Sequence, residues 1–314
     1  MERKYYLEQL QLYLQESPVV ALLGPRQCGK TTLARQYISH SKENHETYFF
    51  DLEDPLHLAA LQTPKLTLDQ LSGLIIIDEI QRIPNLFTYL RVLVDRPENR
   101  IQFLILGSAS RDLIRQSSET LAGRIAYLEL TPFNMQETKD QNKLWLRGGF
   151  PRSYLASNEP ASFRWRKNYI NTFLERDIPN LGITIPSITL RRFWMMLTHY
   201  HGNIFNASEI AMAMGVSSTT IKRYLDILTG AFMIRQLTPW IANLKKRQIK
   251  STKIYLRDSG ILFALKGVKN TQELLLDPAL GAYWEGFALE EIIRYHHADP
   301  EDCYFWATQN RAEL

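Results

Sequence analysis

The sequence predicts an α/β protein in which a parallel sheet built around a glycine loop precedes a helix-turn-helix with a basic segment. Apolar runs at residues 19–23, 74–77 and 101–106 are typical of strands buried on both faces of a parallel sheet. A glycine separates two amphipathic helical patterns within residues 206–235. At about 150 residues per domain, 314 residues suggest two or three domains.

Composition excludes several classes of protein. Hydrophobic residues make up 45% and charged residues 22% of the chain, which is typical of soluble globular proteins and excludes a disordered, collagen-like or coiled-coil chain. The net charge of +4 is too small to indicate nucleic acid by itself. No run of apolar residues is long enough to span a membrane, and the N-terminus lacks a signal-peptide core. The two cysteines are too few for a disulfide framework, so we expect a cytoplasmic protein.

The segment after the first apolar run matches G-x-x-x-x-G-K-[ST]. Glycines in such a loop let successive N–H groups point at phosphate oxygens, and the helix that follows adds its own unpaired N–H groups. The pattern predicts that Lys30 bridges the β- and γ-phosphates of ATP and that the Thr31 hydroxyl ligates Mg²⁺. The predicted nucleotide contacts are Gly24, Pro25, Arg26, Gln27, Cys28, Gly29, Lys30, Thr31 and Thr32. We expect Cys28 to be a small filler in an open loop.

Two further strand ends carry polar side chains. Residues 74–79 read LIIIDE, an apolar strand that ends in two carboxylates. This is the Walker B arrangement, in which Asp78 holds the magnesium and Glu79 orients or deprotonates the attacking water. In ATPases with an extra strand between the two motif strands, a polar residue at its end senses the γ-phosphate. Ser108 is the first candidate and Ser110 the second, although such a serine is often only a helix cap.

The order of several motifs resembles a known family. GPRQCGKTT, FDLEDP, LIIIDEIQRIPN, FLILGSAS, LAGR, LELTPF and GGFP follow one another as in prokaryotic AAA+ ATPases that carry a domain of unknown function called DUF4143. The resemblance implies a P-loop AAA+ parallel-sheet core and extends over nearly the whole chain. Arg124 of LAGR is then a candidate arginine finger, in its own subunit or in a neighbour's if the chain forms an oligomer; the alternative is a surface salt bridge.

Residues 206–235 predict a winged helix-turn-helix. Ser208 is the expected cap of the first helix, Gly215 ends it, and Ser217 or Ser218 caps the second. Lys222 and Arg223 lie on the predicted outward face, where they could meet DNA. The following residues, 240–257, contain six basic residues and no acidic one: Lys245, Lys246, Arg247, Lys250, Lys253 and Arg257. Such a module binds duplex DNA or, alternatively, another protein.

The last segment predicts an incomplete module. In the DUF4143 family, residues from Leu280 onward look like the opening of a restriction-endonuclease-like α/β fold, with Glu285 or Glu290 as its helical glutamate. The metal-binding aspartate and the Glu-x-Lys strand are missing, so we expect no nuclease activity and a truncated module.

These patterns predict four parts: a P-loop AAA+ core at 1–135, a helical lid or linker at 136–200, a winged helix-turn-helix at 201–260 and a truncated endonuclease-like module at 261–314. The predicted function is hydrolysis of ATP with Mg²⁺ to drive or switch the winged-helix module. The alternative is a nucleotide-dependent regulatory switch with negligible turnover.

Overall fold

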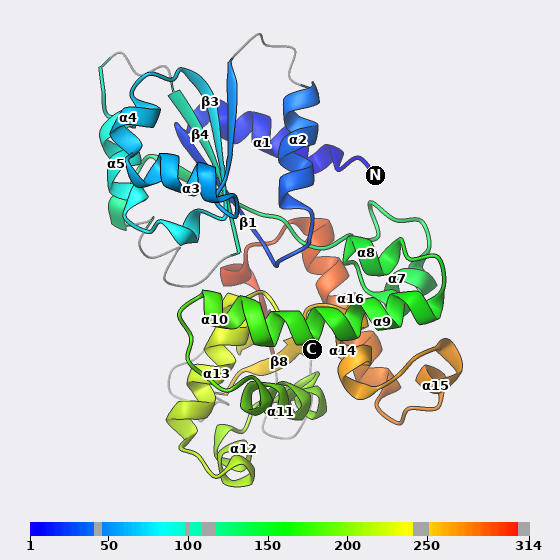
Figure 1. Ribbon diagram of the computed structural model, residues 1–314. Coiled ribbons are helices and arrows are strands. Elements are labelled where there is room, and N and C mark those ends of the chain that lie inside the picture. Colours follow the sequence, from blue (N-terminus) through cyan, green and yellow to red (C-terminus); the bar gives the residue numbers. More distant parts are fainter. Residues whose placement is uncertain (41–45, 98–100, 109–116, 118, 241–250, 307–314) are drawn as a thin grey trace. The chain divides into compact units, whose positions relative to one another are not determined.

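The computed structural model describes residues 1–40, 46–97, 101–108, 117, 119–240 and 251–306 (Figure 1). The chain divides into two compact units, Met1–Thr131 and Pro132–Leu314. Among the described residues, no helix is both long enough and apolar enough to cross a membrane.

Unit 1 contains a five-stranded sheet in the order β2-β3-β4-β1-β5, in which every neighbouring pair is parallel. The strands are β1 (Val19–Leu23), β2 (Thr47–Asp51), β3 (Gly73–Asp78), β4 (Ile101–Gly107) and β5 (Ile125–Glu129). All five residues of β1 are buried, as the apolar run predicted. Because the strands are parallel, the segments that follow β1, β3 and β4 begin at the same edge of the sheet.

Helices cover this sheet. They are α1 (Lys4–Glu16), α2 (Lys30–His40), α3 (Pro55–Gln62), α4 (Pro64–Leu68), the 3₁₀ turn η1 (Ile80–Arg82) and α5 (Leu86–Val94). Leu10 of α1 and Leu33 of α2 belong to one apolar cluster with Val20 and Leu22 of β1. The glycine loop therefore lies between a buried strand and a helix that packs on that strand's sheet.

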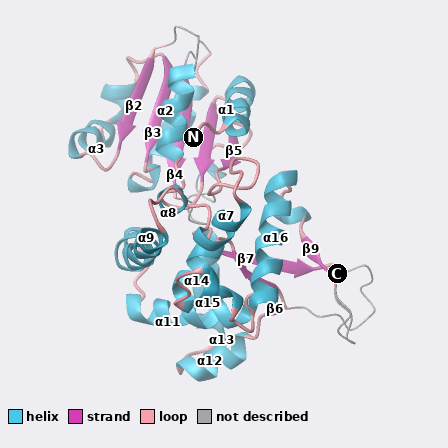
Figure 2. Cartoon of the chain, turned by 90° about the vertical axis from the view of Figure 1, so that its right-hand side faces the viewer, coloured by secondary structure: helices cyan, strands magenta, loops and turns pink. Residues whose placement is uncertain are grey.

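Unit 2 is mainly helical, with a small four-stranded sheet in the order β6-β8-β7-β9 (Figure 2). Its first elements are α7 (Gln141–Arg147), α8 (Pro151–Tyr154), α9 (Glu159–Thr172), the π-helical turn η2 (Phe173–Asp177), α10 (Ile178–Asn180), α11 (Ser187–Leu197) and the 3₁₀ turn η3 (Thr198–Tyr200). They continue with β6 (Asn203–Ile204), α12 (Ala207–Met214), α13 (Ser218–Gly230), β7 (Ile234–Pro239) and β8 (Lys253–Leu256). The last are α14 (Ser259–Lys266), α15 (Thr271–Leu275), α16 (Leu280–His296), the 3₁₀ turn η4 (Pro300–Asp302) and β9 (Tyr304–Phe305).

One apolar cluster extends through unit 2, from Leu146 of α7 to Tyr283 of α16. It includes residues from all three parts that the sequence predicted between 136 and 314, so these parts share a core. Their finer subdivision stays a prediction.

The helix pair α12–α13 follows the predicted local pattern, with one correction. Gly215 ends α12 in the left-handed conformation, with a φ of 69°, and the Ser217 side chain caps α13 by accepting a hydrogen bond from Thr220 N. The cap of α12 is Asn206 instead of Ser208, because the helix begins one residue before that serine. Strand β8 then pairs antiparallel with both β7 and β6.

Gly260 permits a close approach of α14 to α7. A Cβ atom at this position would lie 2.1 Å from the Arg147 carbonyl oxygen, which is backbone and cannot easily move. Asp258 fixes the start of α14 by accepting hydrogen bonds from Ile261 N at 2.8 Å and from Gly149 N at 2.8 Å. The packing of α14 therefore depends on the absence of a side chain at residue 260.

We predict that Gly260→Ala lowers the free energy of unfolding by about 1–3 kcal/mol, since overpacking of a filled interior costs that much. Gly281→Ala in α16 is the control: a Cβ there meets nothing within 4 Å, so stability should stay the same or rise slightly. Urea unfolding of both variants measures this. Equal stability of the two would contradict the close approach.

Candidate functional site

The loop between β1 and α2 has the backbone that the glycine pattern predicted. Gln27 and Gly29 have positive φ angles of 62° and 108°, respectively. Residue 24 must be a glycine for a different reason. A Cβ there would lie 2.2 Å from the carbonyl oxygen of Leu130, which follows β5, so no side chain fits. The loop is therefore held against the chain that follows β5, and it turns into α2 at Lys30.

Lys30 folds back over the loop. Its Nζ donates hydrogen bonds to the carbonyl oxygens of Gly24 at 2.9 Å and Pro25 at 3.0 Å, and only 6% of the residue is exposed. The ammonium is thus positioned inside the loop by backbone carbonyl groups. Thr32, another of the predicted nucleotide contacts, is exposed on α2.

Thr31 and Asp78 are brought together, although 47 residues separate them. The Thr31 hydroxyl donates to Asp78 Oδ2 at 2.6 Å, and Glu79 N donates to Asp78 Oδ1 at 2.9 Å. Burial raises the pKa of Asp78 and the charge of Glu79 adds to this, while the bond from Thr31 opposes it. A hydroxyl and a carboxylate side by side are ligands that suit Mg²⁺, which keeps several waters when it binds.

Glu79 and Ser108 are linked through a residue that sequence reasoning missed. Gln81 of η1 donates its Nε2 hydrogens to Glu79 Oε2 and, at 3.3 Å, to Ser108 Oγ. The polar ends of β3 and β4 therefore meet at one place, as their parallel register requires. Sequence reasoning could have found Gln81 from its position two residues after Glu79. Ser110, the second candidate, lies outside the described residues.

Arg26 and Cys28 have separate environments within the loop. Arg26 forms an ion pair with Glu53, which follows β2 in the FDLEDP motif. The Cys28 side chain is fully buried, and burial raises the pKa of its thiol. It is a filler, as predicted, but the expectation of an open loop at this side chain is wrong: the thiol packs in the apolar cluster with Leu33 and Leu130. The backbone N–H of Cys28 donates to the Pro25 carbonyl oxygen at 3.3 Å, within the loop itself.

Arg124 lies away from this site. Its carbonyl oxygen accepts a hydrogen bond from Val19 N at 3.2 Å, which places the residue beside the amino end of β1, whereas the glycine loop follows the carboxyl end. The guanidinium pairs with Asp95, with Nη2 at 3.0 Å from Oδ2. Within this chain Arg124 therefore does not reach the loop, and an arginine-finger role in its own subunit is not supported.

The basic residues of unit 2 divide into two groups. Lys222 and Arg223 are exposed on α13, as predicted. Lys253 and Arg257 are not exposed cations, which corrects the expectation for this segment: the Lys253 side chain is 5% exposed and lies 3.4 Å from Glu285, and Arg257 contacts Glu290. Lys245, Lys246, Arg247 and Lys250 lie outside the described residues.

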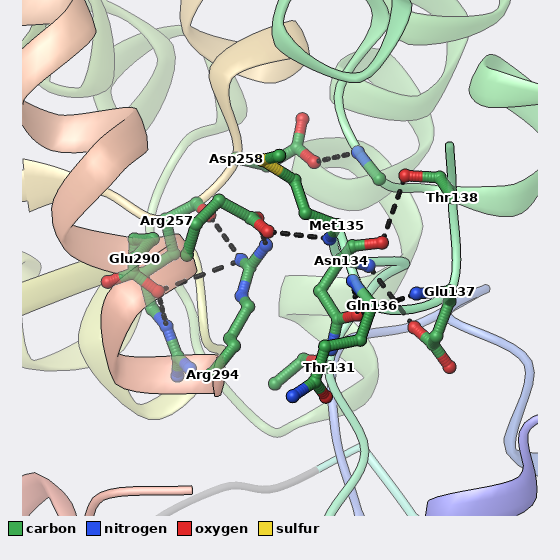
Figure 3. A network of polar contacts seen from close by, with 12 residues as sticks. Thr131, Asn134, Met135, Gln136, Glu137, Thr138, Arg257, Asp258, Glu290 and Arg294 are labelled. Carbon is green, nitrogen blue, oxygen red and sulfur yellow. Dashed lines mark hydrogen bonds and ion pairs between the residues drawn. The ribbon is translucent and has the colours of Figure 1, made fainter. Parts of the chain in front are cut away.

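Glu290 is surrounded by three arginines. Figure 3 labels two of them, Arg257 and Arg294. Arg235 Nη2 lies 3.1 Å from Glu290 Oε2, Arg257 Nε 3.4 Å and Arg294 Nη2 3.6 Å from the same oxygen. Burial alone would raise the pKa of Glu290, but the three positive charges lower it to about 2. This carboxylate is committed to ion pairs inside unit 2.

The neighbouring glutamates are also engaged. Glu291 accepts hydrogen bonds from Met135 N at 2.7 Å and from Arg294 Nη1 at 3.0 Å, and Glu285 accepts one from the Tyr255 hydroxyl at 2.6 Å. No group of three or more His, Cys, Asp or Glu side chains that could hold a metal ion occurs in the part of the chain that the structure describes.

His201 is buried beside this network. Its Nδ1 accepts a hydrogen bond from Leu256 N at 3.0 Å, and burial lowers its pKa to about 4, although the charge of Glu290 acts in the opposite direction. An unfolded histidine binds a proton near pH 6.5. Protonation therefore favours the unfolded chain between about pH 6.5 and 4, and Glu290 adds a further loss of stability between its ordinary pKa of 4.5 and about 2.

We predict that the free energy of unfolding falls as pH is lowered from 6.5 to 4, with a contribution from His201 of up to about 1.4 kcal/mol per pH unit. His201→Asn keeps an acceptor for Leu256 N and removes the titration, so its slope should be shallower. His296→Asn, at an exposed position, is the control. Denaturant unfolding at several pH values measures this, and an unchanged slope in His201→Asn would contradict it.

The fold and the loop define this protein as one with an AAA-type P-loop ATPase fold. A family model described as an AAA domain matches residues 16–139. A second, described as a domain of unknown function (DUF8612), matches residues 138–272. The resemblance to the DUF4143 family is therefore wrong for the second part of the chain, whereas the AAA part is confirmed.

Two relatives show which family the chain belongs to. The uncharacterized proteins Rv2008c of Mycobacterium tuberculosis and Mb2031c of Mycobacterium bovis are each 49% identical over 316 residues, which cover 100% of this chain and 70% of the relative. The chain belongs to the same family as these two proteins. Among solved structures, the Walker-type ATPase PABY2304 of Pyrococcus abyssi is similar in fold, with a TM-score of 0.54 at 14% identity, over 84% of this chain and 95% of that chain.

Proposed function

We propose that unit 1 binds ATP with Mg²⁺ and hydrolyses it. The observation that carries this proposal is the 2.6 Å hydrogen bond between Thr31 and Asp78, directly beside the Lys30 ammonium. A strand-end carboxylate, a helix-start hydroxyl and a lysine inside a glycine loop form the donor set that a magnesium triphosphate requires. The match to an AAA domain over residues 16–139 supports the same assignment.

The residues of the site fit such a ligand. The positive φ angles of Gln27 and Gly29 turn the loop so that its N–H groups can face an anion, and α2 adds the positive end of its dipole. Lys30 would exchange its two carbonyl partners for phosphate oxygens. Bound Mg²⁺ would neutralise charge that develops on the phosphates, held by Thr31 and Asp78. Arg26 would line the pocket once released from Glu53.

Glu79 would position the attacking water, and Ser108 would contact the γ-phosphate. Gln81 connects the two side chains, so it is well placed to orient Glu79. Arg124, at the other edge of the sheet, would act only on the nucleotide of a neighbouring subunit in an oligomer. A cytoplasmic location also stays a prediction.

We predict that Lys30→Ala loses nucleotide binding, because the loop loses its buried cation. Glu79→Gln should keep ATP binding while the rate of hydrolysis falls by about 10²-fold or more, as expected when a group that orients or activates water is lost. Glu8→Gln, at an exposed position of α1, is the control outside the proposed chemistry. Binding of a fluorescent ATP analogue and release of phosphate measure these effects.

Wild-type hydrolysis by Glu79→Gln would reject the role of Glu79, and wild-type binding by Lys30→Ala would reject the site. Negligible turnover in the wild-type protein that binds ATP normally would favour the second function, a nucleotide-dependent switch.

We further propose that α12, α13, β7 and β8 form a winged helix-turn-helix that ATP controls and that binds duplex DNA. The support is the glycine turn at Gly215, the β8 pairing and the two exposed cations of α13, Lys222 and Arg223. Lys245, Lys246 and Arg247 would add to this surface. We propose no nuclease role for Glu285 or Glu290, because both carboxylates are engaged in contacts inside unit 2.

We predict that DNA affinity falls steeply as salt rises from about 50 to about 200 mM. A plot of the logarithm of the DNA association constant against the logarithm of salt concentration has a negative slope. Lys222→Ala with Arg223→Ala should make this slope less steep by about 0.9 for each phosphate that these side chains neutralise in the wild-type protein. Lys139→Ala, at an exposed position outside the module, is the control. Fluorescence anisotropy with labelled duplex measures this. Affinity that is indifferent to salt, or absent, would favour a protein partner.

A further inference from the structure

Helix α11 has two apolar faces. Its inner face carries Leu190, Phe193, Trp194 and Leu197, all buried in the main cluster of unit 2. Its outer face carries Ile188, which is 76% exposed, and Met195, which is 47% exposed, seven residues further on. Positions three, four and seven residues apart lie on one side of a helix. Arg191 and Arg192 lie between them on the same side, so this exposed face combines apolar and basic residues.

This outer face forms one wall of an open groove. The groove has a volume of about 540 Å³, and Leu265 and Lys266 at the end of α14 contribute its other wall. Its lining is Ile188, Arg191, Arg192, Met195, Met196, Thr198, His199, Leu265 and Lys266. Methionine side chains at such a position adapt readily to the shape of a bound partner.

The rim of the groove is basic. Arg191 donates to Asn171 Oδ1 at 2.7 Å and Arg192 to the Ala213 carbonyl oxygen at 2.7 Å, so neutral groups orient both guanidiniums. Lys266 lies in the last turn of α14. Among the described residues, none of these three cations forms an ion pair with a carboxylate, and the groove lining contains no acidic residue. The cations thus remain available for a negatively charged partner.

We propose that this groove binds an acidic amphipathic helix of a partner protein. Apolar side chains of the partner would enter between Ile188, Met195 and Leu265, and its flanking carboxylates would pair with Arg191, Arg192 and Lys266. A helix fits better than a compact ligand because the lining residues of α11 and η3 extend from Ile188 to His199, a separation of 11 residues or about 17 Å. This surface is separate from the proposed ATP site and does not depend on it.

The test uses the full chain and two fluorescein-labelled helical peptides of about 16 residues. Both carry leucines on one face; one has glutamates on the flanks and the other has lysines. We expect the acidic peptide to bind at least about tenfold more tightly in fluorescence anisotropy. Arg191→Glu with Arg192→Glu should reverse this preference, because the charges then oppose the acidic peptide and attract the basic one.

A second pair of variants tests the apolar contact. Ile188→Ser with Met195→Ser should weaken binding of the acidic peptide by about tenfold or more, whereas Leu276→Ser, at a position that is 84% exposed elsewhere in unit 2, should leave its binding unchanged. Far-UV circular dichroism verifies that each variant is folded.

Three results would overturn the proposal: no binding of the acidic peptide, equal binding of both peptides, or a preference that the charge reversal leaves intact. In sedimentation, a dimer of the wild-type chain that the Ile188→Ser, Met195→Ser variant abolishes would be a fourth such result, because it would assign the groove to a second copy of the chain.

Discussion

The structure of unit 1 depends on the parallel packing of β1 between β4 and β5. This packing buries every residue of β1 and places the end of β5 against the glycine loop, where Leu130 N donates to the Leu23 carbonyl oxygen at 2.7 Å. Gly24 is fixed by the same contact, since a side chain there would collide with the backbone of Leu130. The start of the loop is therefore fixed against the chain that follows β5, which helps to orient the loop N–H groups toward an anion.

The same parallel register brings the remaining site residues to one edge. Asp78, at the end of β3, accepts a hydrogen bond from the Thr31 hydroxyl. Ser108, after the end of β4, accepts one from Gln81, which also donates to Glu79. In unit 2 the ionisable groups have a different use. Glu290 with its three arginines is buried and ties β7, α16 and the segment between β8 and α14 together. Removing one partner from such a network leaves an uncompensated buried charge, so substitutions within it should be strongly destabilising.

How far the sequence predicted these features depends on the range of the interaction. The glycine loop, the strand that ends in Asp78 and the glycine turn between α12 and α13 are local patterns, and the structure has them where they were expected. The pairing of Arg26 with Glu53 and the link through Gln81 were missed, because their partners come from separate strands. For Arg124 the structure has the alternative, a surface salt bridge with Asp95; the motif alone does not reveal at which edge of the sheet the residue lies.

The count of charged residues in 240–257 also led to a wrong expectation about which cations are exposed. Lys253 and Arg257 belong to a run without acidic residues, yet their partners Glu285 and Glu290 lie on α16, far along the chain. The second part of the chain shows a similar limit, since an order of short motifs suggested DUF4143 where the family model is DUF8612.

The central claim, that Thr31, Asp78 and Lys30 together hold a magnesium triphosphate, is tested most directly by calorimetric titration of ATP into the protein with Mg²⁺ and with excess chelator. We predict one site per chain in the presence of Mg²⁺ and an affinity weakened by about tenfold or more without it. Affinity that is the same in both titrations, or an absence of binding in both, would contradict the account.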